Sequence, residues 1–260
     1  MNGLDFLHRD VPKLGKRVHR LGLSGSHGID DAGIRAAFDL GVNYVLWTRP
    51  GMVPALRDAV RRDRERLVIA TGPVIGHFRF TIRRAAEKAL RTLGTDYLDV
   101  FQLFWAGTMS AIDGRTLDEL QRLKDEGKIR MSGISIHDRQ RAARLVEDSP
   151  IDLFMLRYNA AHPGAETEVF PHLARRRPAV VAYTATSWRK LLRRPKGWAG
   201  PAMTAGECYR FCLGNPSVDV VLTAPASRTE LEANLGEVAR GPLDPQRLSE
   251  VREFGRTVHG

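Results

Sequence analysis

The sequence predicts a single (β/α)8 barrel of the TIM type, in the α/β class, with an additional C-terminal helix. Short apolar runs alternate with amphipathic stretches about eight times along the 260 residues. With 43% hydrophobic residues the chain can bury one sizeable core, and its length is close to the roughly 250 residues typical of such barrels. We therefore expect one domain over residues 1–260, with its functional groups at the carboxyl ends of the strands.

Eight apolar segments are expected as the barrel strands. Residues 67–71 (LVIAT) are the clearest, because a nearly all-apolar run is typical of a parallel strand buried on both faces. The expected strands cover residues 20–24, 42–47, 67–71, 97–105, 130–136, 152–158, 180–184 and 218–223.

Amphipathic stretches between these runs predict the helices. Asp30 and Asp31 open the first helix and Gly41 ends it. The later helices are expected at residues 52–64, 81–93, 115–126, 139–146, 164–176, 204–213 and 228–235, with the additional helix within 242–259.

An open, doubly wound sheet would show the same alternation of strands and helices. Such a sheet usually has fewer units and carries a G-x-G-x-x-G turn after its first strand. Here that turn contains Gly25 and Gly28 without the right helix start, so the closed barrel is favoured.

The net charge of +10 raises the question of a nucleic-acid partner. Most arginines alternate with acids on expected helices, which is typical of a solvated helix face, so we expect no nucleic-acid partner. Residues 188–196 (WRKLLRRPK) are the exception, with five basic residues and no acid, and they favour a local phosphate-binding loop.

Cysteine content and hydropathy exclude other classes. Cys208 and Cys212 lie four residues apart with no histidine nearby, so we interpret them as buried helix-face thiols and expect no metal. No run approaches the roughly 18 apolar residues of a membrane span, and residues 1–10 lack the apolar region of a signal peptide. We expect a soluble, cytoplasmic protein without a membrane partner.

Several segments, taken together, resemble the aldo-keto reductase family. They occur in family order at residues 20–22, 41–44 (GVNY), 93–99 (LGTDYLD), 123–130 (LKDEGKIR), 133–135 and 226–235 (ASRTELEANL). The resemblance implies a (β/α)8 barrel that binds an extended nicotinamide dinucleotide, usually NADP, across its carboxyl-terminal mouth. It also implies carbonyl reduction by hydride transfer, with a tyrosine donating the proton and an aspartate, a lysine and a histidine tuning it.

The residues expected at these four tetrad positions do not fit that chemistry. Trp47 stands for the aspartate, Met52 for the tyrosine five residues later, Gly72 for the lysine and Phe104 for the histidine, while Trp105 matches an aromatic residue of the family's substrate pocket. A carbonyl oxygen that gains hydride must meet a proton donor or preorganised dipoles. Because these four side chains supply neither, ordinary tetrad chemistry is not expected.

The resemblance also assigns a cofactor site. In the nicotinamide part, Ser135 is kept, Ile136 and Met155 replace amide-bearing partners, and Tyr183 matches a ring-stacking aromatic, although simple packing explains a tyrosine there equally well.

At the phosphate end, Ser227 and Arg228 begin a helix that could attract an anion, and Asn234 matches an adenine contact. Glu230 would repel a 2′-phosphate, although with Ser227 it also forms a capping box. NADP(H) or a related nucleotide is therefore a candidate cofactor that the sequence leaves open.

Other polar residues are expected at the mouth of the barrel. Arg49 and Arg157 have the chemistry to bind an anion, and Tyr158 or His162 is the candidate proton donor outside the tetrad. A single histidine at such a position more often has a structural or surface role than a catalytic one. The full set is His27, Arg49, His77, His137, Asp138, Arg157, Tyr158, Asn159 and His162.

Three functional hypotheses follow. The first, favoured by the family resemblance, is an atypical NADP(H)-linked oxidoreductase. The second is a non-catalytic ligand-binding or interaction barrel, whose mouth, walled by Trp47, Phe104 and Trp105, takes an apolar or aromatic small molecule. The third is a non-redox lyase or isomerase that uses Arg49 and a histidine of the rim.

Overall fold

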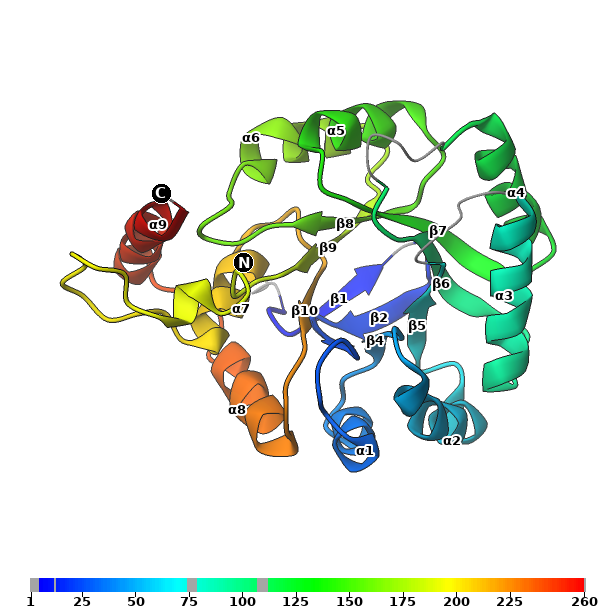
Figure 1. Cartoon of the computed structure of the whole chain (residues 1–260), viewed down its shortest axis with the longest axis horizontal. Coiled ribbons are helices and arrows are strands. Elements are labelled where there is room, and N and C mark those ends of the chain that lie inside the picture. Colours follow the sequence, from blue (N-terminus) through cyan, green and yellow to red (C-terminus); the bar gives the residue numbers. More distant parts are fainter. Residues whose placement is uncertain (1–4, 12, 74–78, 107–111, 260) are drawn as a thin grey trace.

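The computed structural model describes residues 5–11, 13–73, 79–106 and 112–259, and it confirms the closed barrel. Each strand pairs in parallel with the next, and the last pairs with the first (Figure 1). The strands are β3 (Leu21–Ser24), β4 (Tyr44–Leu46), β5 (Val68–Thr71), β6 (Leu98–Leu103), β7 (Ile129–Ile136), β8 (Leu153–Arg157), β9 (Ala179–Tyr183) and β10 (Val220–Thr223).

Helices surround the barrel, and their buried faces form the larger apolar cluster together with the outward-facing side chains of the strands. They are α1 (Asp31–Asp39), α2 (Val53–Asp63), α3 (Arg79–Leu93), α4 (Gly114–Asp125), α5 (Arg139–Asp148), α6 (Ala165–Glu168), α7 (Ala205–Gly214), α8 (Arg228–Ala239) and α9 (Pro245–His259). Short 3₁₀ turns are η1 (Pro50–Met52), η2 (Phe170–Ala174) and η3 (Lys190–Leu192).

The prediction of one helix over residues 164–176 is largely wrong. It divides into the single turn of α6 and the 3₁₀ turn η2, separated by Val169 at φ −126°. Pro171 has no N–H group to continue an α-helical ladder, which accounts for the change of helix type at this point. The additional C-terminal helix, α9, is confirmed, and it buries Val251 and Phe254.

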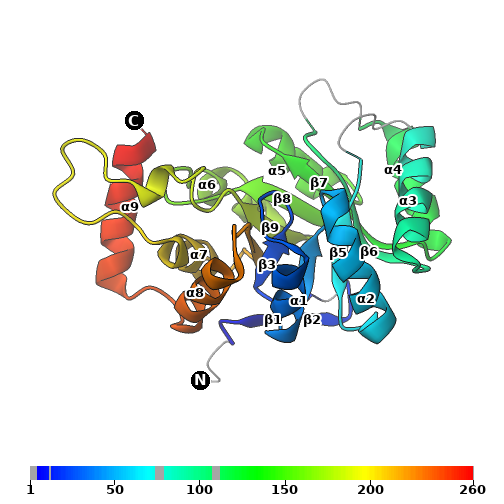
Figure 2. The same ribbon diagram turned by 60° about the horizontal axis from the view of Figure 1, so that its bottom comes forward.

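An antiparallel hairpin that the pattern analysis did not assign closes the amino-terminal end of the barrel. Strands β1 (His8–Val11) and β2 (Lys16–His19) pair with His8 opposite His19, and they lie across the lower end of the barrel in Figure 2. Val11 and Val18 are buried in the same apolar cluster as the inward-facing side chains of the strands. The other end of the barrel is therefore the open one.

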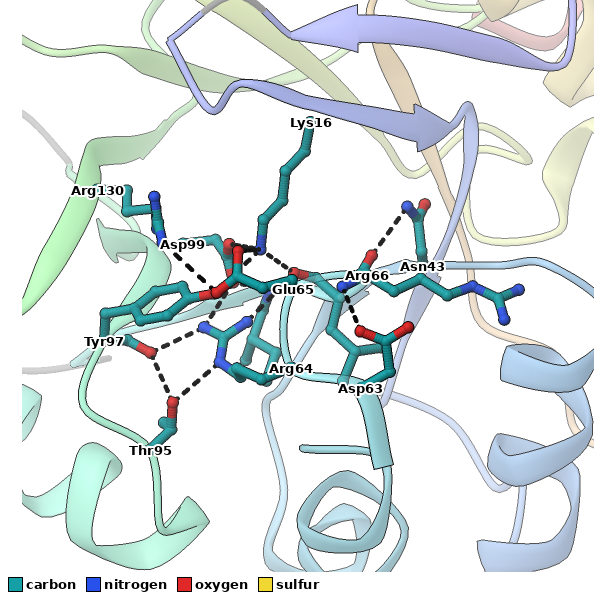
Figure 3. Close-up of polar contacts among 12 residues, drawn as sticks. Lys16, Asn43, Asp63, Arg64, Glu65, Arg66, Thr95, Tyr97, Asp99 and Arg130 are labelled. Atoms are coloured by element: carbon teal, nitrogen blue, oxygen red, sulfur yellow. Dashed lines mark hydrogen bonds and ion pairs between the residues drawn. The ribbon is translucent and has the colours of Figure 1, made fainter. Parts of the chain in front are cut away.

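A charged network lies under this hairpin (Figure 3). Asp99 on β6 is fully buried, and its carboxylate accepts hydrogen bonds from Lys16 Nζ and Arg64 Nη2, each at 2.8 Å. The backbone N–H of Ile69 donates to the same carboxylate at 2.9 Å. The guanidinium of Arg64 also lies 3.8 Å from the centroid of the Tyr97 ring. These contacts join the hairpin to β5, β6 and the end of α2.

Inward and outward side chains alternate along the strands, and this fixes which residues face the barrel interior. On β4, Tyr44 and Leu46 belong to the inner cluster, whereas Val45 belongs to the outer one. Beyond the end of β4, Trp47 packs against the outer cluster. Because the side-chain period of a strand is two, a shift of one residue moves a side chain to the other face.

Candidate functional site

A cavity of about 920 Å³ opens where the strands end at their carboxyl side. Its lining comes from successive strand ends around the barrel, including Ser24, Leu46, Thr71, Tyr183 and Leu222. This is the end of a (β/α)8 barrel at which enzymes of that fold place their active sites.

Several aromatic side chains form part of the wall of the cavity. Trp47, Phe104, Trp105, Tyr183 and Trp188 all line it. Trp105 and Trp188 are 64% and 58% exposed and stand at its opening. Both adopt a positive φ, at 52° and 51°, a left-handed conformation that bulky residues seldom adopt.

The residues expected at the tetrad positions differ in whether they line the cavity and in which apolar cluster they pack. Phe104 faces the inner cluster and lines the cavity as expected. Met52 is fully buried and is not among the cavity-lining residues of the described chain, since its sulfur packs over Gly25. Trp47 lines the cavity from the outer side, and Leu46 is the residue of β4 that faces inward at the strand end.

Gly72 lies where neighbouring backbone leaves no space for a side chain. A Cβ atom on Gly72 would lie 1.8 Å from the carbonyl oxygen of Gln102 and 2.8 Å from its carbonyl carbon. Real Cβ atoms essentially never approach another heavy atom so closely, and backbone cannot turn aside as a flexible side chain can. A lysine at this position would therefore require a different path for the ends of β5 and β6.

A hydrogen-bonded pair lies in the cavity opposite the tetrad positions. The hydroxyl of Tyr183 lies 2.8 Å from Nε2 of His137, and both residues line the cavity. Burial raises the pKa of Tyr183 to about 12, although the nearby charge of Arg157 and the side chain of Ser135 act in the opposite direction. Burial, with a smaller contribution from Arg157, lowers the pKa of His137, so a neutral imidazole is favoured.

The expected nicotinamide residues lie close to this pair. Ser135 is fully buried, and its hydroxyl forms no hydrogen bond within the described residues, although it lies near enough to Tyr183 to affect that phenol. Met155 lines the cavity, and its sulfur lies 3.5 Å from the amide nitrogen of the buried Gln102. Ile136 is buried in the outer cluster.

Helix α8 begins at the rim of the cavity. Ser227 caps it by accepting a hydrogen bond from the Glu230 N–H at 3.2 Å. The Glu230 carboxylate, which lines the cavity, accepts from the N–H of Ala226 at 2.8 Å, so the return bond of the expected capping box goes one residue earlier. Arg228 pairs with Glu232 at 2.7 Å.

Asn234, the expected adenine contact, is only 4% exposed and lies away from the rim. Its side-chain nitrogen donates to the Thr223 hydroxyl at 3.2 Å, and that hydroxyl also bonds to Tyr209. As placed, its amide group is engaged inside the protein and does not line the cavity of the described chain.

Tyr158, one of the two candidate proton donors, does not reach the cavity lining formed by the described residues. It is fully buried, and its hydroxyl donates to Glu166 at 2.5 Å. Arg252 of α9 in turn donates to both oxygens of Glu166, at 2.9 and 3.1 Å. Burial, followed by the bond to Glu166, raises the pKa of Tyr158. Its ring belongs to the outer apolar cluster.

His162, the other candidate donor, is also outside the cavity lining of the described chain. Its Nδ1 lies 3.2 Å from the side-chain oxygen of the buried Asn159, and this oxygen also accepts a hydrogen bond from the Ala161 N–H. The amide nitrogen of Asn159 donates to the Thr184 carbonyl. These bonds hold the loop after β8.

The remaining expected residues divide between cavity and scaffold. Asp138 caps α5 by accepting from the Arg141 N–H at 2.9 Å. Arg157 lies 5.9 Å from the centroid of the Trp188 ring. His27 and Arg49 line the cavity, whereas His77 lies outside the described residues.

The basic loop after β9 reaches the cavity through Trp188, Arg189 and Leu192, and Arg189 is one of the five basic residues of the expected phosphate-binding loop at 188–196. Ser187, Trp188 and Arg189 all have positive φ, between 49° and 68°. No sequence pattern predicts three consecutive non-glycine residues in the left-handed backbone conformation, so this turn could not be predicted. Its effect is to bring one guanidinium and one indole to the rim.

The cavity and its surroundings contain no metal centre in the described ranges. Within those ranges, no three His, Cys, Asp or Glu side chains are placed to hold a metal ion. Cys208 and Cys212 are buried, and burial raises the pKa of each thiol. None of the helices in the described chain has the length and apolar character needed to cross a bilayer.

The fold is a closed (β/α)8 barrel with a cavity at the carboxyl ends of its strands, and comparison with known proteins identifies the family. The model of the aldo/keto reductase family matches residues 27–193, more than half of the chain. The chain therefore belongs to the aldo/keto reductase family.

Solved structures share the fold at low sequence identity. The holo form of aldo-keto reductase AKR11C1 from Bacillus halodurans has a TM-score of 0.79 at 23% identity, and the match covers 96% of this chain and 95% of that one. An aldo/keto reductase from Klebsiella pneumoniae in complex with NADP and acetate has a TM-score of 0.77 at 22% identity, covering 92% of each chain.

Two bacterial proteins are similar in sequence. The chain is 28% identical over 182 residues to the uncharacterized oxidoreductase YqkF of Bacillus subtilis, a match that covers 64% of this chain and 59% of YqkF. It is 26% identical over 193 residues to the methylglyoxal reductase YeaE of Escherichia coli, covering 70% of this chain and 67% of YeaE. The match thus spans about three fifths of the length of YqkF and two thirds of that of YeaE.

Proposed function

We propose that this protein is an oxidoreductase linked to NADP(H) that works without the Asp/Tyr/Lys/His tetrad of its family. Family membership supports the redox class. The observation that carries the second part of the proposal is Gly72, because the carbonyl of Gln102 occupies the space that the Cβ of a lysine would need.

The other three positions support the same proposal. Because Leu46 faces inward at the end of β4, we assign it, rather than Trp47, to the position of the aspartate. Five residues further on, the tyrosine position then falls on Gly51 instead of Met52. Phe104 keeps the position of the histidine. None of these side chains can donate a proton or stabilise an alkoxide.

The residues of the cavity suit the nicotinamide ring and a phosphate of a nucleotide better than they suit a 2′-phosphate. Tyr183 offers a ring whose orientation its bond to His137 fixes, and Arg189 places a cation at the rim. The start of α8 supplies backbone N–H groups suited to a phosphate, whereas the Glu230 carboxylate disfavours a 2′-phosphate. When bound, a reduced nicotinamide would supply the hydride.

Titration with NADPH and with NADH, followed by cofactor fluorescence, tests the proposal. We expect a dissociation constant in the micromolar range for at least one of them. Tyr183→Leu should weaken that binding, whereas Tyr158→Phe should not, because Tyr158 lies outside the cavity lining. Absence of binding at millimolar concentrations would refute the redox proposal and favour a non-catalytic ligand-binding barrel.

A second experiment tests the proposal that the protein does not use the tetrad of its family. If the proposal is right, Trp47→Asp or Leu46→Asp combined with Gly72→Lys will not raise aldehyde reduction above the wild-type rate, because Gly51 and Phe104 still provide no proton donor. Turnover is measured as NADPH oxidation with an aromatic aldehyde. A clear gain in either double variant would contradict the proposal.

A further inference from the structure

The cavity has a polar flank beside its aromatic wall. Ser24, Ser26 and His27 follow β3, and Thr48 and Arg49 follow β4, and all five line the cavity. They lie at adjoining strand ends, because β3 and β4 pair in parallel. A ligand in the cavity therefore meets an apolar surface and a polar surface side by side.

Arg49 is the strongest charge on this flank. Its guanidinium has no carboxylate within ion-pair distance in the described part of the chain, whereas Arg35 and Arg62, on the helices behind it, each pair with an aspartate. The flank contributes no acidic side chain to the cavity lining; the carboxylate of Glu230, which lines the cavity, belongs to α8. The positive charge of Arg49 is thus left uncompensated by the protein at this place.

The guanidinium is held in position before any ligand arrives. Its Nη2 donates to the carbonyl oxygen of Ile29 in the loop before α1. The indole N–H of Trp47 donates to the Arg49 carbonyl at 3.0 Å, and the Trp47 carbonyl accepts from the Thr71 hydroxyl at 3.0 Å. The last two bonds connect the backbone of Arg49 to Trp47 in the aromatic wall and, through Trp47, to Thr71 of β5.

One donor of Arg49 is buried and has no partner among the described residues, namely Nε. A buried donor without an acceptor is unfavourable by an amount comparable with a lost hydrogen bond, so structures seldom keep one without a reason. A guanidinium binds a carboxylate through two parallel N–H groups, and removal from bulk water strengthens that contact. A carboxylate in the cavity would supply the missing acceptor once the Arg49 side chain turns its Nε toward the cavity.

We propose that Arg49 is the anion-recognising group of the cavity, and that its ligands are small apolar or aromatic molecules bearing a carboxylate. The apolar body lies against Trp47, Phe104 and Trp105, and the carboxylate lies against Arg49. As a statement about the substrate, this inference rests on the proposed function; as a statement about binding, it can be tested without a cofactor.

Two probes of nearly the same shape test the charge. Calorimetric titration of the cofactor-free protein with 2-naphthoate and with 2-naphthamide should give tighter binding of 2-naphthoate, on the order of 10- to 100-fold, as expected for a charge-assisted pair in a partly dry site. Arg49→Gln should remove that preference by weakening 2-naphthoate alone. Arg49→Lys, which keeps the charge without the planar fork, should retain part of it.

A matched control is Arg189→Gln, which removes another guanidinium of the same cavity. We expect it to leave the preference for 2-naphthoate unchanged. Equal binding of the two probes by the wild-type protein, no binding of either, an unchanged preference in Arg49→Gln, or loss of the preference in Arg189→Gln would each overturn the proposal.

The design separates failure of this inference from failure of the proposed function. Cofactor titration decides the redox proposal without a carboxylate probe, and the naphthalene probes decide the role of Arg49 without a cofactor. The comparison of two probes in the wild-type protein also remains decisive if Arg49→Gln loses its fold, which circular dichroism would reveal.

Discussion

The two ends of this barrel treat charge in opposite ways. At the end closed by the hairpin, the buried carboxylate of Asp99 is surrounded by Lys16, Arg64 and a backbone N–H. At the open end, the cavity is lined by Leu46, Gly72 and Phe104, to which we assign three of the family's tetrad positions in our proposal. The ionisable groups at the closed end are paired with one another, whereas these three positions at the open end carry no ionisable side chain.

This difference indicates that charged groups at the closed end serve stability, whereas the residues at the open end serve the chemistry of the site. The contacts of Asp99 join elements distant in sequence, and a buried carboxylate at this place must keep such partners. The mouth contributes less to stability, because its cavity is not filled by side chains. Its chemistry can therefore change while the barrel remains, and function must be argued from the site rather than from the fold.

The largest expected effect comes from breaking the network at the closed end. Asp99→Asn removes the negative charge from between two cations, and loss of one member of a buried ion pair destabilises by roughly 3–5 kcal/mol. Urea unfolding followed by circular dichroism measures it. Glu65→Gln, on an exposed side chain of the same network, should cost less than about 1 kcal/mol. Equal effects of the two variants would show that Asp99 is not the centre of the network.

At the open end of the barrel, adding a methyl group to Gly72 is expected to lower the free energy of unfolding by a smaller amount. Gly72→Ala forces the ends of β5 and β6 apart, and overpacking of this kind typically costs roughly 1–3 kcal/mol. Gly114→Ala is the matched control, because nothing lies within 4 Å of its Cβ position and its φ is not in the left-handed region. Thermal unfolding compares them, and a neutral Gly72→Ala would remove the main argument against a lysine at this position.

Tyr158→Phe distinguishes a structural phenol from a catalytic one. The variant loses the bond to Glu166, which leaves that half-buried carboxylate to Arg252 alone, and a loss of roughly 0.5–1.5 kcal/mol of unfolding free energy is expected. Affinity for NADPH and the rate of any aldehyde reduction should stay unchanged. A fall in turnover with unchanged stability would instead return Tyr158 to the role of proton donor.

The smallest expected effect is a dependence on pH at the closed end. Burial would raise the pKa of Asp152, but its ion pairs with Lys124 and Lys13, at 2.7 and 2.8 Å, outweigh burial and lower that pKa below its ordinary value of 3.8. A lowered pKa in the folded state gives stability that is present above about pH 4 and is lost as the pH falls through the folded pKa. The stability difference between wild type and Asp152→Asn should therefore shrink in acid. Urea midpoints measured from neutral pH to about pH 3 would show a constant difference if this pair contributes nothing.

Much of the barrel could be predicted because its signals are local and periodic. The run at residues 67–71 and the amphipathic stretch that became α3 follow directly from side-chain spacing. The hairpin was missed because its strands have four residues each and only one side of the ribbon is apolar. The helix after β8 was overextended because apolar spacing continues past Pro171, where the α-helical ladder cannot.

The site could be predicted only in part, because proximity in a barrel depends on register. Trp47 and Phe104 were expected in the cavity wall and line it. Tyr158 and Leu46 show the limit of pattern analysis: each lies at or near a strand end, and only the alternation in the folded sheet decides which one faces the cavity. Arg189 could be predicted only as part of the basic segment 188–196, since its place at the cavity depends on a left-handed turn of the backbone.

The sequence by itself determined the alternation of strands and helices, and with it the closed barrel, because hydrophobic periodicity and helix ends are properties of neighbouring residues. Only the tertiary structure decided that a carbonyl fills the space beside Gly72, that Tyr158 points away from the mouth, and that Arg49 stands in the cavity without a carboxylate partner in the described chain. These are distances between residues far apart in the chain, and side-chain spacing alone does not fix them.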